Sequence, residues 1–410
     1  RRTAQRLLFQ RKTKATGALH KLAIRSHSAE ARVHALWLLE GLGQSRAEDL
    51  AANLQHPEAG LRENALKISE NHPEWANALA AHILARQKDP SPRVRFQMLN
   101  TLGILKGIPG SNAAKINVLE RDIEDHWVQL ALIAASAGEE MQLLQSAAKK
   151  FGKDLSEKQA RFFSYLAATI ANSQDEQAIA SLLEEHSTQV QTAIFQGLSQ
   201  LWTYRGVPSA MGIPQQRRLL QYINAKTPAA LRSAALSMLQ VCGIPVQEQA
   251  TVAALAKAIL SNPSVDMAFR ADAIALQSLI NPDAQRTTLM RLLVEKEPLM
   301  LRQAALSGLN QCSGAEVSQF ITQNWSKLDS TLQDQSIDVL MANAERCHQL
   351  ITAVENKTIK RDAIGWRRMV GLMNNDDVGV RVHARKVLAA NGLAREAVYS
   401  GYLAALNQQG

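Results

Sequence analysis

The chain repeats one short pattern of apolar and polar positions. An apolar residue is followed by Arg or Gln, then by two free positions and a small residue, as at Leu61, Arg62 and Ala65. We call this pattern the repeat signature. Counted from Arg1, its second position recurs every 30 to 48 residues, at Arg32, Arg62, Arg95, Gln129, Arg161, Gln191, Arg232, Arg270, Arg302, Gln333 and Arg381. A period in this range is typical of stacked helical repeats.

Each repeat predicts two helices separated by a turn. Apolar residues at helical spacing precede the signature, as at Leu50 and Leu54, and the signature begins a second helix with apolar positions i, i+4 and i+7. Proline disfavours helix at the residue before it, so turns are predicted at His56-Pro57, Asp89-Pro90-Ser91-Pro92, Asn262-Pro263 and Glu297-Pro298. No alternating strand pattern competes, and the signatures of tetratricopeptide and ankyrin repeats are absent. The sequence therefore predicts an all-α, HEAT-like α-solenoid of stacked antiparallel helix pairs with a right-handed superhelix.

The arginine of the signature has a structural interpretation. In HEAT units, an Asp six residues before this Arg commonly begins the turn, and the pair can link neighbouring units by charge-assisted hydrogen bonds. Asp89 and Arg95 have this spacing, but other residues occupy the Asp position elsewhere, so a continuous ladder is not predicted. We expect instead that the arginine stems cover apolar surface while their heads stay in solvent. The residues assigned to this structural set are Arg32, Arg62, Asp89, Arg95, Arg161, Arg232, Arg270, Arg302 and Arg381.

A single array of about 12 units is predicted for residues 1–410. Hydrophobic residues make up 46% of the chain and aromatic residues 5%, which suits helix packing by Ala and Leu. Because each repeat contacts mainly its neighbours, this length does not require separate globular domains. The least regular stretches are 106–112 and 203–215, and the second is a possible bend or sub-boundary.

The net charge of +9 is concentrated at one end. Residues 1–25 hold eight basic residues and no acid, whereas the remaining residues hold 38 basic and 37 acidic ones. We interpret this end as a possible domain-docking face, formed by Arg1, Arg2, Arg6, Arg11, Lys12 and Lys14. The alternative is a nucleic-acid-binding HEAT-like protein such as an alkylpurine DNA glycosylase, whose cleft would be lined with Arg and Lys. The near-neutral repeats after residue 25 count against it.

A search for chemistry returns no constellation that could carry a reaction. There is no G-x-S-x-G, H-E-x-x-H, P-loop or C-x-x-C-H motif. His20, His27 and His34 lie seven residues apart, but a predicted turn separates them and no Cys or carboxylate joins them at ligand spacing. The three cysteines, Cys242, Cys312 and Cys347, are interpreted as buried free thiols. We therefore expect no catalytic, cofactor-binding or metal-binding residue in this chain.

The tryptophans have two interpretations, core packing and stacking on nucleic-acid bases. They stand among apolar helix positions, which favours core packing; they are Trp37, Trp75, Trp127, Trp202, Trp325 and Trp366. No apolar run approaches the roughly 18 residues needed to span a bilayer. Neither end of the chain has the composition of a polar capping repeat, so we expect flanking domains to cover the ends.

Six segments carry a family resemblance, and they occur in order along most of the chain. They are 1–8 (RRTAQRLL), 35–43 (ALWLLEGLG), 56–66, 89–97 (DPSPRVRFQ), 126–129 (HWVQ) and 377–385 (DVGVRVHAR). Together they resemble the HEAT-repeat region of the large membrane-bound dehydrogenase-like, haem-binding proteins of planctomycete and verrucomicrobial bacteria. These motifs are moderately specific, because HEAT units converge on similar consensus residues.

The resemblance implies architecture more than activity. In such proteins a β-propeller of sugar-dehydrogenase type precedes the repeats, and a c-type cytochrome domain follows them. By resemblance, the parent protein would be exported to the periplasm or another extracytoplasmic compartment and would transfer electrons, with haem c as its cofactor. The present chain would be a non-catalytic scaffold, spacer or protein-interaction module, and its partners would be the flanking propeller and cytochrome domains. No catalytic or haem-ligating residue of the family maps onto this sequence.

Overall fold

A computed structural model describes Leu7, Phe9 and residues 15–152, 154–184, 186–209 and 211–389. Within these residues the regular structure is helical throughout, without strands, so the predicted all-α, HEAT-like solenoid class is confirmed. The chain divides into two compact units, residues 1–218 and 219–410, and each is described by itself. The division falls within α14, just after the stretch 203–215 that the sequence marked as a possible sub-boundary.

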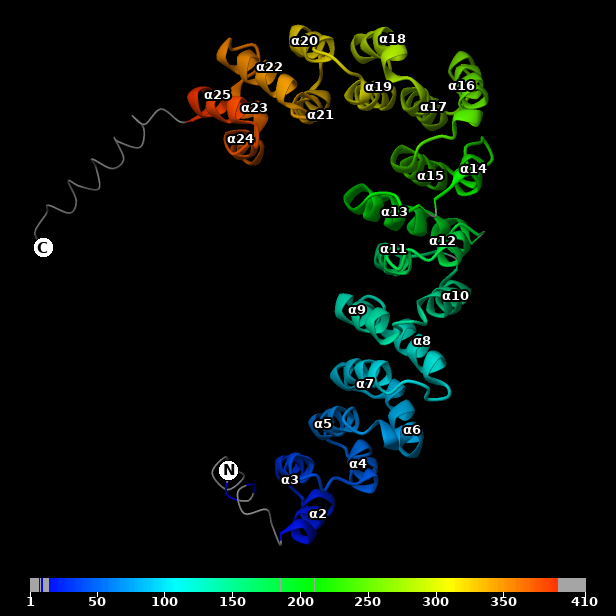
Figure 1. Cartoon of the computed structure of the whole chain (residues 1–410), viewed down its shortest axis with the longest axis vertical. Helices are drawn as coiled ribbons and strands as arrows, with labels where there is room; N and C mark the ends of the chain where they lie inside the picture. The colour runs from blue at the N-terminus through cyan, green and yellow to red at the C-terminus, as the bar shows by residue number, and fades with distance from the viewer. Residues whose placement is uncertain are drawn as a thin grey trace, which may run out of the picture. The chain divides into compact units, whose positions relative to one another are not determined.

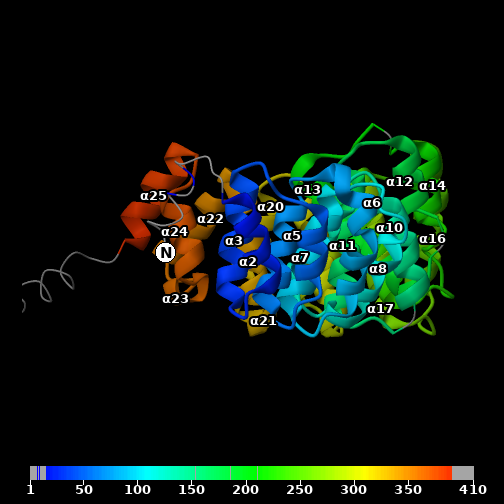
Figure 2. The same cartoon turned by 90° about the horizontal axis from the view of Figure 1, so that it is seen from below.

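Unit 1 is built from two rows of helices (Figures 1 and 2). The signature residues begin the helices of one row, and each helix of this row packs on the next: α3 (Ala29–Gly41), α5 (Ala59–Ser69), α7 (Pro92–Ile104), α9 (His126–Ala135), α11 (Glu157–Ala171) and α13 (Thr188–Arg205). We call it the signature row. The other helices are α2 (Thr16–Arg25), α4 (Ala47–Leu54), α6 (Ala76–Leu84), α8 (Ser111–Asp122), α10 (Glu140–Phe151), α12 (Glu176–Leu182) and α14 (Ile213–Leu220), with the 3₁₀ turns Pro73–Trp75 and Ala85–Lys88.

In unit 2, signature helices alternate with other helices in the same way. Its signature helices are α15 (Ala229–Cys242), α17 (Met267–Ile280), α19 (Leu299–Gln311), α21 (Ser330–Leu340) and α25 (Val378–Leu388). Between them lie α16 (Val246–Ser261), α18 (Pro282–Val294), α20 (Glu316–Gln323), α22 (Ala344–Glu355), α23 (Arg361–Ile364) and α24 (Trp366–Met373), with a 3₁₀ turn at Trp325–Lys327. The longest signature interval, between Gln333 and Arg381, holds three helices, α22 to α24, in place of one.

The core lies between the rows and consists of aliphatic side chains at helical spacing. In α7, for example, Val94, Met98 and Leu102 are at most 2% exposed. Small residues let adjacent signature helices approach closely. A Cβ added to Gly197 of α13 would overlap the backbone of Ser164 in α11, and the Ser164 hydroxyl donates a hydrogen bond of 2.8 Å to the Ala193 carbonyl.

His72 connects the end of α5 to α3, the preceding helix of the signature row. His72 follows α5, and its Nε2 and Nδ1 lie 2.7 Å from Glu40 Oε2 and 3.0 Å from Glu74 Oε1. The imidazole stacks on the Trp75 ring, with centroids 3.8 Å apart. Burial works to lower the pKa of His72, but the hydrogen bonds with the two carboxylates outweigh it and raise the pKa.

Candidate protein-interaction surface

The signature side chains tie down the turn that precedes their own helix. Arg32 Nε donates to the Ser26 carbonyl at 2.7 Å, and Arg62 Nη1 donates to the carbonyls of His56 and Pro57 at 2.7 and 2.6 Å. The same bonds recur six or five residues upstream of Arg95, Arg232 and Arg381, and Gln129 replaces them with a bond of 2.6 Å to the Ile123 carbonyl. Carbonyl groups at helix ends and turns need such donors, which explains why Gln can substitute for Arg.

Two of these arginines also form forked ion pairs with an aspartate of the following repeat. Arg62 donates from Nε and Nη2 to Asp89 at 2.7 and 2.6 Å, and Arg95 makes the same forked contact with Asp122 at 2.5 and 2.6 Å. Arg62, Arg95 and Asp89 are at most 5% exposed. The expectation that the arginine heads stay in solvent is therefore wrong for Arg62 and Arg95. The physical reason is that a bidentate carboxylate replaces the lost hydration of the guanidinium.

Asp89 does not pair with the arginine of its own unit. Its carboxylate binds Arg62 of the preceding unit, while its carbonyl oxygen accepts a bond of 2.7 Å from Arg95 Nη1. The burial of Asp89 would raise its pKa, but the bonds from Arg62 and from the backbone of Ser91 outweigh this effect and lower the pKa. The signal that sequence reasoning missed is a separation of 27 residues between Arg and the Asp of the next turn.

The remaining signature arginines vary in burial. Arg302 shares the 27-residue spacing and lies 3.1 Å from Asp329, but this pair is more exposed. Arg232 is 3% exposed, stacks over the Phe269 ring at 4.4 Å and pairs with Asp272, so the solvent expectation is wrong here too. Arg270 and Arg381 are half-buried, and Arg161 is exposed.

The histidine, cysteine and basic residues that the sequence marked as candidates can now be compared with the structure. His20 is buried with Nδ1 2.6 Å from Asp49 Oδ2, and among the residues that the structure describes no group of three or more His, Cys, Asp or Glu side chains could hold a metal ion. Cys312 and Cys347 are buried free thiols as predicted, whereas Cys242 is half-buried. No helix in the described ranges is long and apolar enough to cross a membrane. Arg1, Arg2, Arg6, Arg11, Lys12 and Lys14, predicted as a docking face, lie outside the described residues.

Two tryptophans do not pack in the core. Trp202 and Trp325 are buried at 3% and 8% exposure, as predicted, but Trp127 is 68% and Trp366 is 69% exposed. The core prediction is wrong for Trp127 and Trp366, and each of them stands in the first turn of its helix. Exposed tryptophans of this degree are typical of surfaces that bind other molecules.

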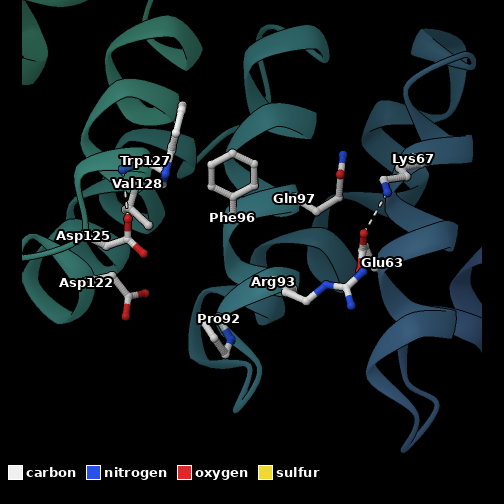
Figure 3. Close-up of a pocket in the computed structure, with 10 residues that line it drawn as sticks. All are labelled: Glu63, Lys67, Pro92, Arg93, Phe96, Gln97, Asp122, Asp125, Trp127 and Val128. Atoms are coloured by element: carbon white, nitrogen blue, oxygen red, sulfur yellow. Dashed lines mark hydrogen bonds and ion pairs between the residues drawn. The ribbon is translucent and has the colours of Figure 1, made fainter. Parts of the chain in front are cut away.

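Trp127 borders a pocket in the signature row of unit 1. The pocket has a volume of about 430 Å³ and is lined by residues of α5, α7 and α9, by the last residue of α8 and by one residue of the turn before α9: Glu63, Lys67, Pro92, Arg93, Phe96, Gln97, Asp122, Asp125, Trp127 and Val128. Figure 3 shows Phe96 on the central helix, with Trp127 on one side and Glu63 and Lys67 on the other. Phe96, Trp127 and Val128 give the pocket an apolar floor. Its size falls within the roughly 300–1,000 Å³ of pockets that bind ligands.

Charged groups surround this floor and most of them are paired. Glu63 Oε1 lies 2.7 Å from Lys67 Nζ, and Glu63 Oε2 lies 2.9 Å from Arg93 Nη2. Asp122 is held by Arg95. Asp125 caps α9, since its Oδ1 accepts a bond of 2.8 Å from the Trp127 backbone N–H. The helices thus fix each carboxylate through a specific partner, which is suited to recognition by shape and charge.

The aromatic surface extends to α11. The His126 ring contacts both Trp127 and Tyr165, with centroids 5.9 Å apart in each case. Tyr165 and Leu130 are themselves 37% and 39% exposed. Side chains from two successive signature helices, α9 and α11, therefore form one exposed patch, which lies beside the pocket.

The comparisons with known proteins bear on the fold alone. No protein-family model matches the chain, and no curated protein matches it. Among solved structures, it is similar to Kap121p, with 13% identity, a TM-score of 0.47 and coverage of 92% of this chain and 49% of that chain. It is also similar to the karyopherin Kap121p bound to the extreme C-terminus of the protein phosphatase Cdc14p, with 12% identity, a TM-score of 0.47 and coverage of 91% and 49%. The chain thus spans about half the length of these structures.

Proposed function

We propose that this chain is a non-catalytic α-solenoid scaffold that binds a protein partner at the pocket between α5, α7 and α9. The observation that carries the proposal is the 68% exposure of Trp127 in the lining of that pocket. A large aromatic side chain held by a rigid helix loses little conformational entropy on binding, which is why tryptophan is enriched among the residues that dominate binding energy. Two of the three carboxylates of the pocket, Glu63 and Asp122, are held in ion pairs.

The same pocket argues against the nucleic-acid alternative. Its lining holds the carboxylates of Glu63, Asp122 and Asp125 against the two cations of Lys67 and Arg93. A phosphate backbone is attracted by an excess of Lys and Arg, and carboxylates in the groove repel it. A DNA glycosylase cleft would need the opposite balance, so a protein segment is the ligand that the pocket favours.

The family resemblance leads us to propose a setting for the scaffold. In this proposal the chain belongs to a longer exported protein, in which a propeller precedes the repeats and a c-type cytochrome domain follows them and carries the haem. This chain contains no C-x-x-C-H sequence, so haem c attachment does not fit its own residues. The coding sequence is expected to continue past Gly410 into that motif, and a continuation into further helical repeats without it would contradict the setting.

A binding experiment tests the scaffold function. The propeller and cytochrome domains are produced separately and titrated into this chain by calorimetry, with the variants Trp127→Ala and Trp366→Ala as a matched pair of equally exposed tryptophans. We expect one domain to bind, with at least about a tenfold loss of affinity for Trp127→Ala and no loss for Trp366→Ala, because truncating a central tryptophan typically costs 2 kcal/mol or more. Equal losses in both variants, or no binding, would contradict the proposal.

A further inference from the structure

The pocket between α5, α7 and α9 has opposite charges at its two edges. We infer that it binds an extended protein segment in which an apolar side chain stands between an acidic and a basic residue. This inference rests on the proposed protein-binding function and specifies the partner's chemistry. It follows from the floor, from the charge at each edge, and from the distance between the edges.

The floor selects an apolar side chain. Phe96 and Trp127 present aromatic surface, and Val128 is only 2% exposed beneath them. Burying an apolar side chain against such surface contributes roughly 25 cal/mol for each Å² removed from water. A side chain bearing a charge would lose its hydration at this point without a partner. The anchor residue of the ligand is therefore apolar.

The edge formed by α5 and the start of α7 presents an exposed cation, Arg93. The Glu63 side chain is 11% exposed and is shared by two cations, Lys67 and Arg93, whose side chains are 42% and 79% exposed. A second carboxylate, Glu70, also acts on Lys67, so Arg93 is the cation that this edge offers to a ligand. The exposed Arg93 guanidinium has five N–H donors in a planar fork, which suits a second carboxylate. This edge attracts an acidic residue of the ligand.

The edge at the start of α9 keeps a net negative charge. Both oxygens of Asp122 are engaged by Arg95, whereas Asp125 is exposed and, within the described part of the chain, has no salt-bridge partner. Its N-cap bond to Trp127 uses only Oδ1. The other oxygen can accept a hydrogen bond from a cation, and the indole of Trp127 can add a cation–π contact. This edge attracts a basic residue of the ligand.

The separation of the edges sets the spacing in the ligand. Arg93 stands on α7 but its guanidinium lies 2.9 Å from Glu63 of α5, whereas Asp125 caps α9. Packed helices lie about 8–10 Å apart, so the two charges are separated by between one and two such spacings. An extended segment advances about 3.3 Å per residue, so the acid and the base are expected about three to six residues apart, with the apolar residue between them.

Peptide selection tests this chemistry. A phage-displayed library of random octapeptides is selected on the immobilised chain, and the enriched peptides are remeasured by fluorescence anisotropy against Trp127→Ala. We expect enrichment of an apolar residue flanked by an acid and a base about three to six positions apart, and at least about a tenfold loss of affinity for Trp127→Ala.

Two charge variants separate the edges. Asp125→Asn removes the charge and keeps an amide that can still cap the helix, and it should weaken binding about two- to fivefold and abolish the preference for the base only. Arg93→Gln should abolish the preference for the acid only, with a loss of the same size. Trp366→Ala serves as the control and should change nothing.

The outcomes distinguish the inference from the proposed function. If peptides bind in a Trp127-dependent way without the paired charges, or with acids alone, the inference is wrong while the protein-binding function stands. If peptides from the library and the flanking domains both bind Trp127→Ala undiminished, the pocket is not the binding site and both fail.

Discussion

The buried pair between Arg62 and Asp89 is expected to dominate the stability of its region. In Arg62→Met, a side chain of similar length and no charge takes the place of Arg62, and the Asp89 carboxylate, in a residue that is 2% exposed, loses two hydrogen bonds of 2.7 and 2.6 Å. It keeps only the Ser91 N–H at 3.0 Å and a longer contact of 3.3 Å with Arg86. Leaving a buried charge without its partner costs about 3–5 kcal/mol, and the remaining contacts place this variant near 3 kcal/mol.

The matched control is Arg302→Met. Arg302 has the same place in the signature and the same 27-residue spacing to its partner Asp329, and it also donates to a carbonyl before its helix. The side chains of this pair are 15% and 42% exposed, so its loss is expected to cost less than about 1 kcal/mol. Both variants lose carbonyl bonds, and the difference between them isolates the burial of the ion pair.

Urea unfolding gives the free energy of unfolding, and hydrogen exchange of the α5 and α7 amides locates the loss. In Arg62→Met/Asp89→Asn the charge is gone as well, so much of the lost stability should return. The lowered pKa of Asp89 means that its contribution is present above its unfolded pKa of about 3.9 and is lost as the pH falls through the folded value. The deficit of Arg62→Met should therefore shrink as the pH falls from about 5 towards 3. Equal costs for Arg62→Met and Arg302→Met would refute the reasoning.

Three further predictions concern a histidine, a glycine and a thiol. The glutamate partners of His72 raise its pKa, so the protonated imidazole stabilises the folded state fully below its unfolded pKa of about 6.5. This stabilisation is lost as the pH rises through the folded pKa. The melting temperature of His72→Gln should therefore depend less on pH between pH 6 and 8 than that of the unmodified chain. Gly197→Ala should destabilise unit 1 by about 1–3 kcal/mol through backbone overlap, whereas Gly60→Ala, where nothing lies within 4 Å of the added carbon, should stabilise α5 by about 0.5–1 kcal/mol in urea unfolding. Burial raises the pKa of Cys242 to about 12, so the native thiol should react with a disulfide reagent at pH 8 far more slowly than in urea, and equal rates would contradict this.

The helical repeat could be predicted because its causes are local. Apolar spacing, small residues and prolines at the turns act over a few neighbouring residues, and α5 and α7 begin where His56-Pro57 and Asp89-Pro90 predict. The partners of Arg62 and Arg95 were missed because each carboxylate stands one unit ahead, after an intervening helix. A contact of that kind depends on how units stack, and apolar periodicity carries no information about it.

The exposure of Trp127 had a signal in the sequence. It stands immediately before the signature residue Val128, as Arg93 stands before Val94 and Met300 before Leu301. Each of these three preceding residues is exposed, so the position faces solvent in these repeats. The apolar residues around Trp127 favoured a core position for it. Aligning the repeats on their signature shows instead that the residue before the signature is exposed. The pocket itself needed the structure, because its lining comes from four helices, α5, α7, α8 and α9.

The double role of Asp89 has a consequence for how the array opens. Because Asp89 holds Arg62 through its carboxylate and Arg95 through its carbonyl oxygen, the helices from α5 to α8 share one connected set of charged bonds. Local opening of any of them breaks bonds in its neighbours, so this segment should behave as one cooperative foldon. At Gln129, a neutral side-chain amide donates to the carbonyls of Ile123 and Lys158 only, so the connected set of charged bonds ends before α9. The boundary of the foldon then falls at α9, the helix that carries Trp127. A ligand bound at the proposed surface would contact residues on both sides of this boundary and would oppose the local unfolding of the segment from α5 to α8.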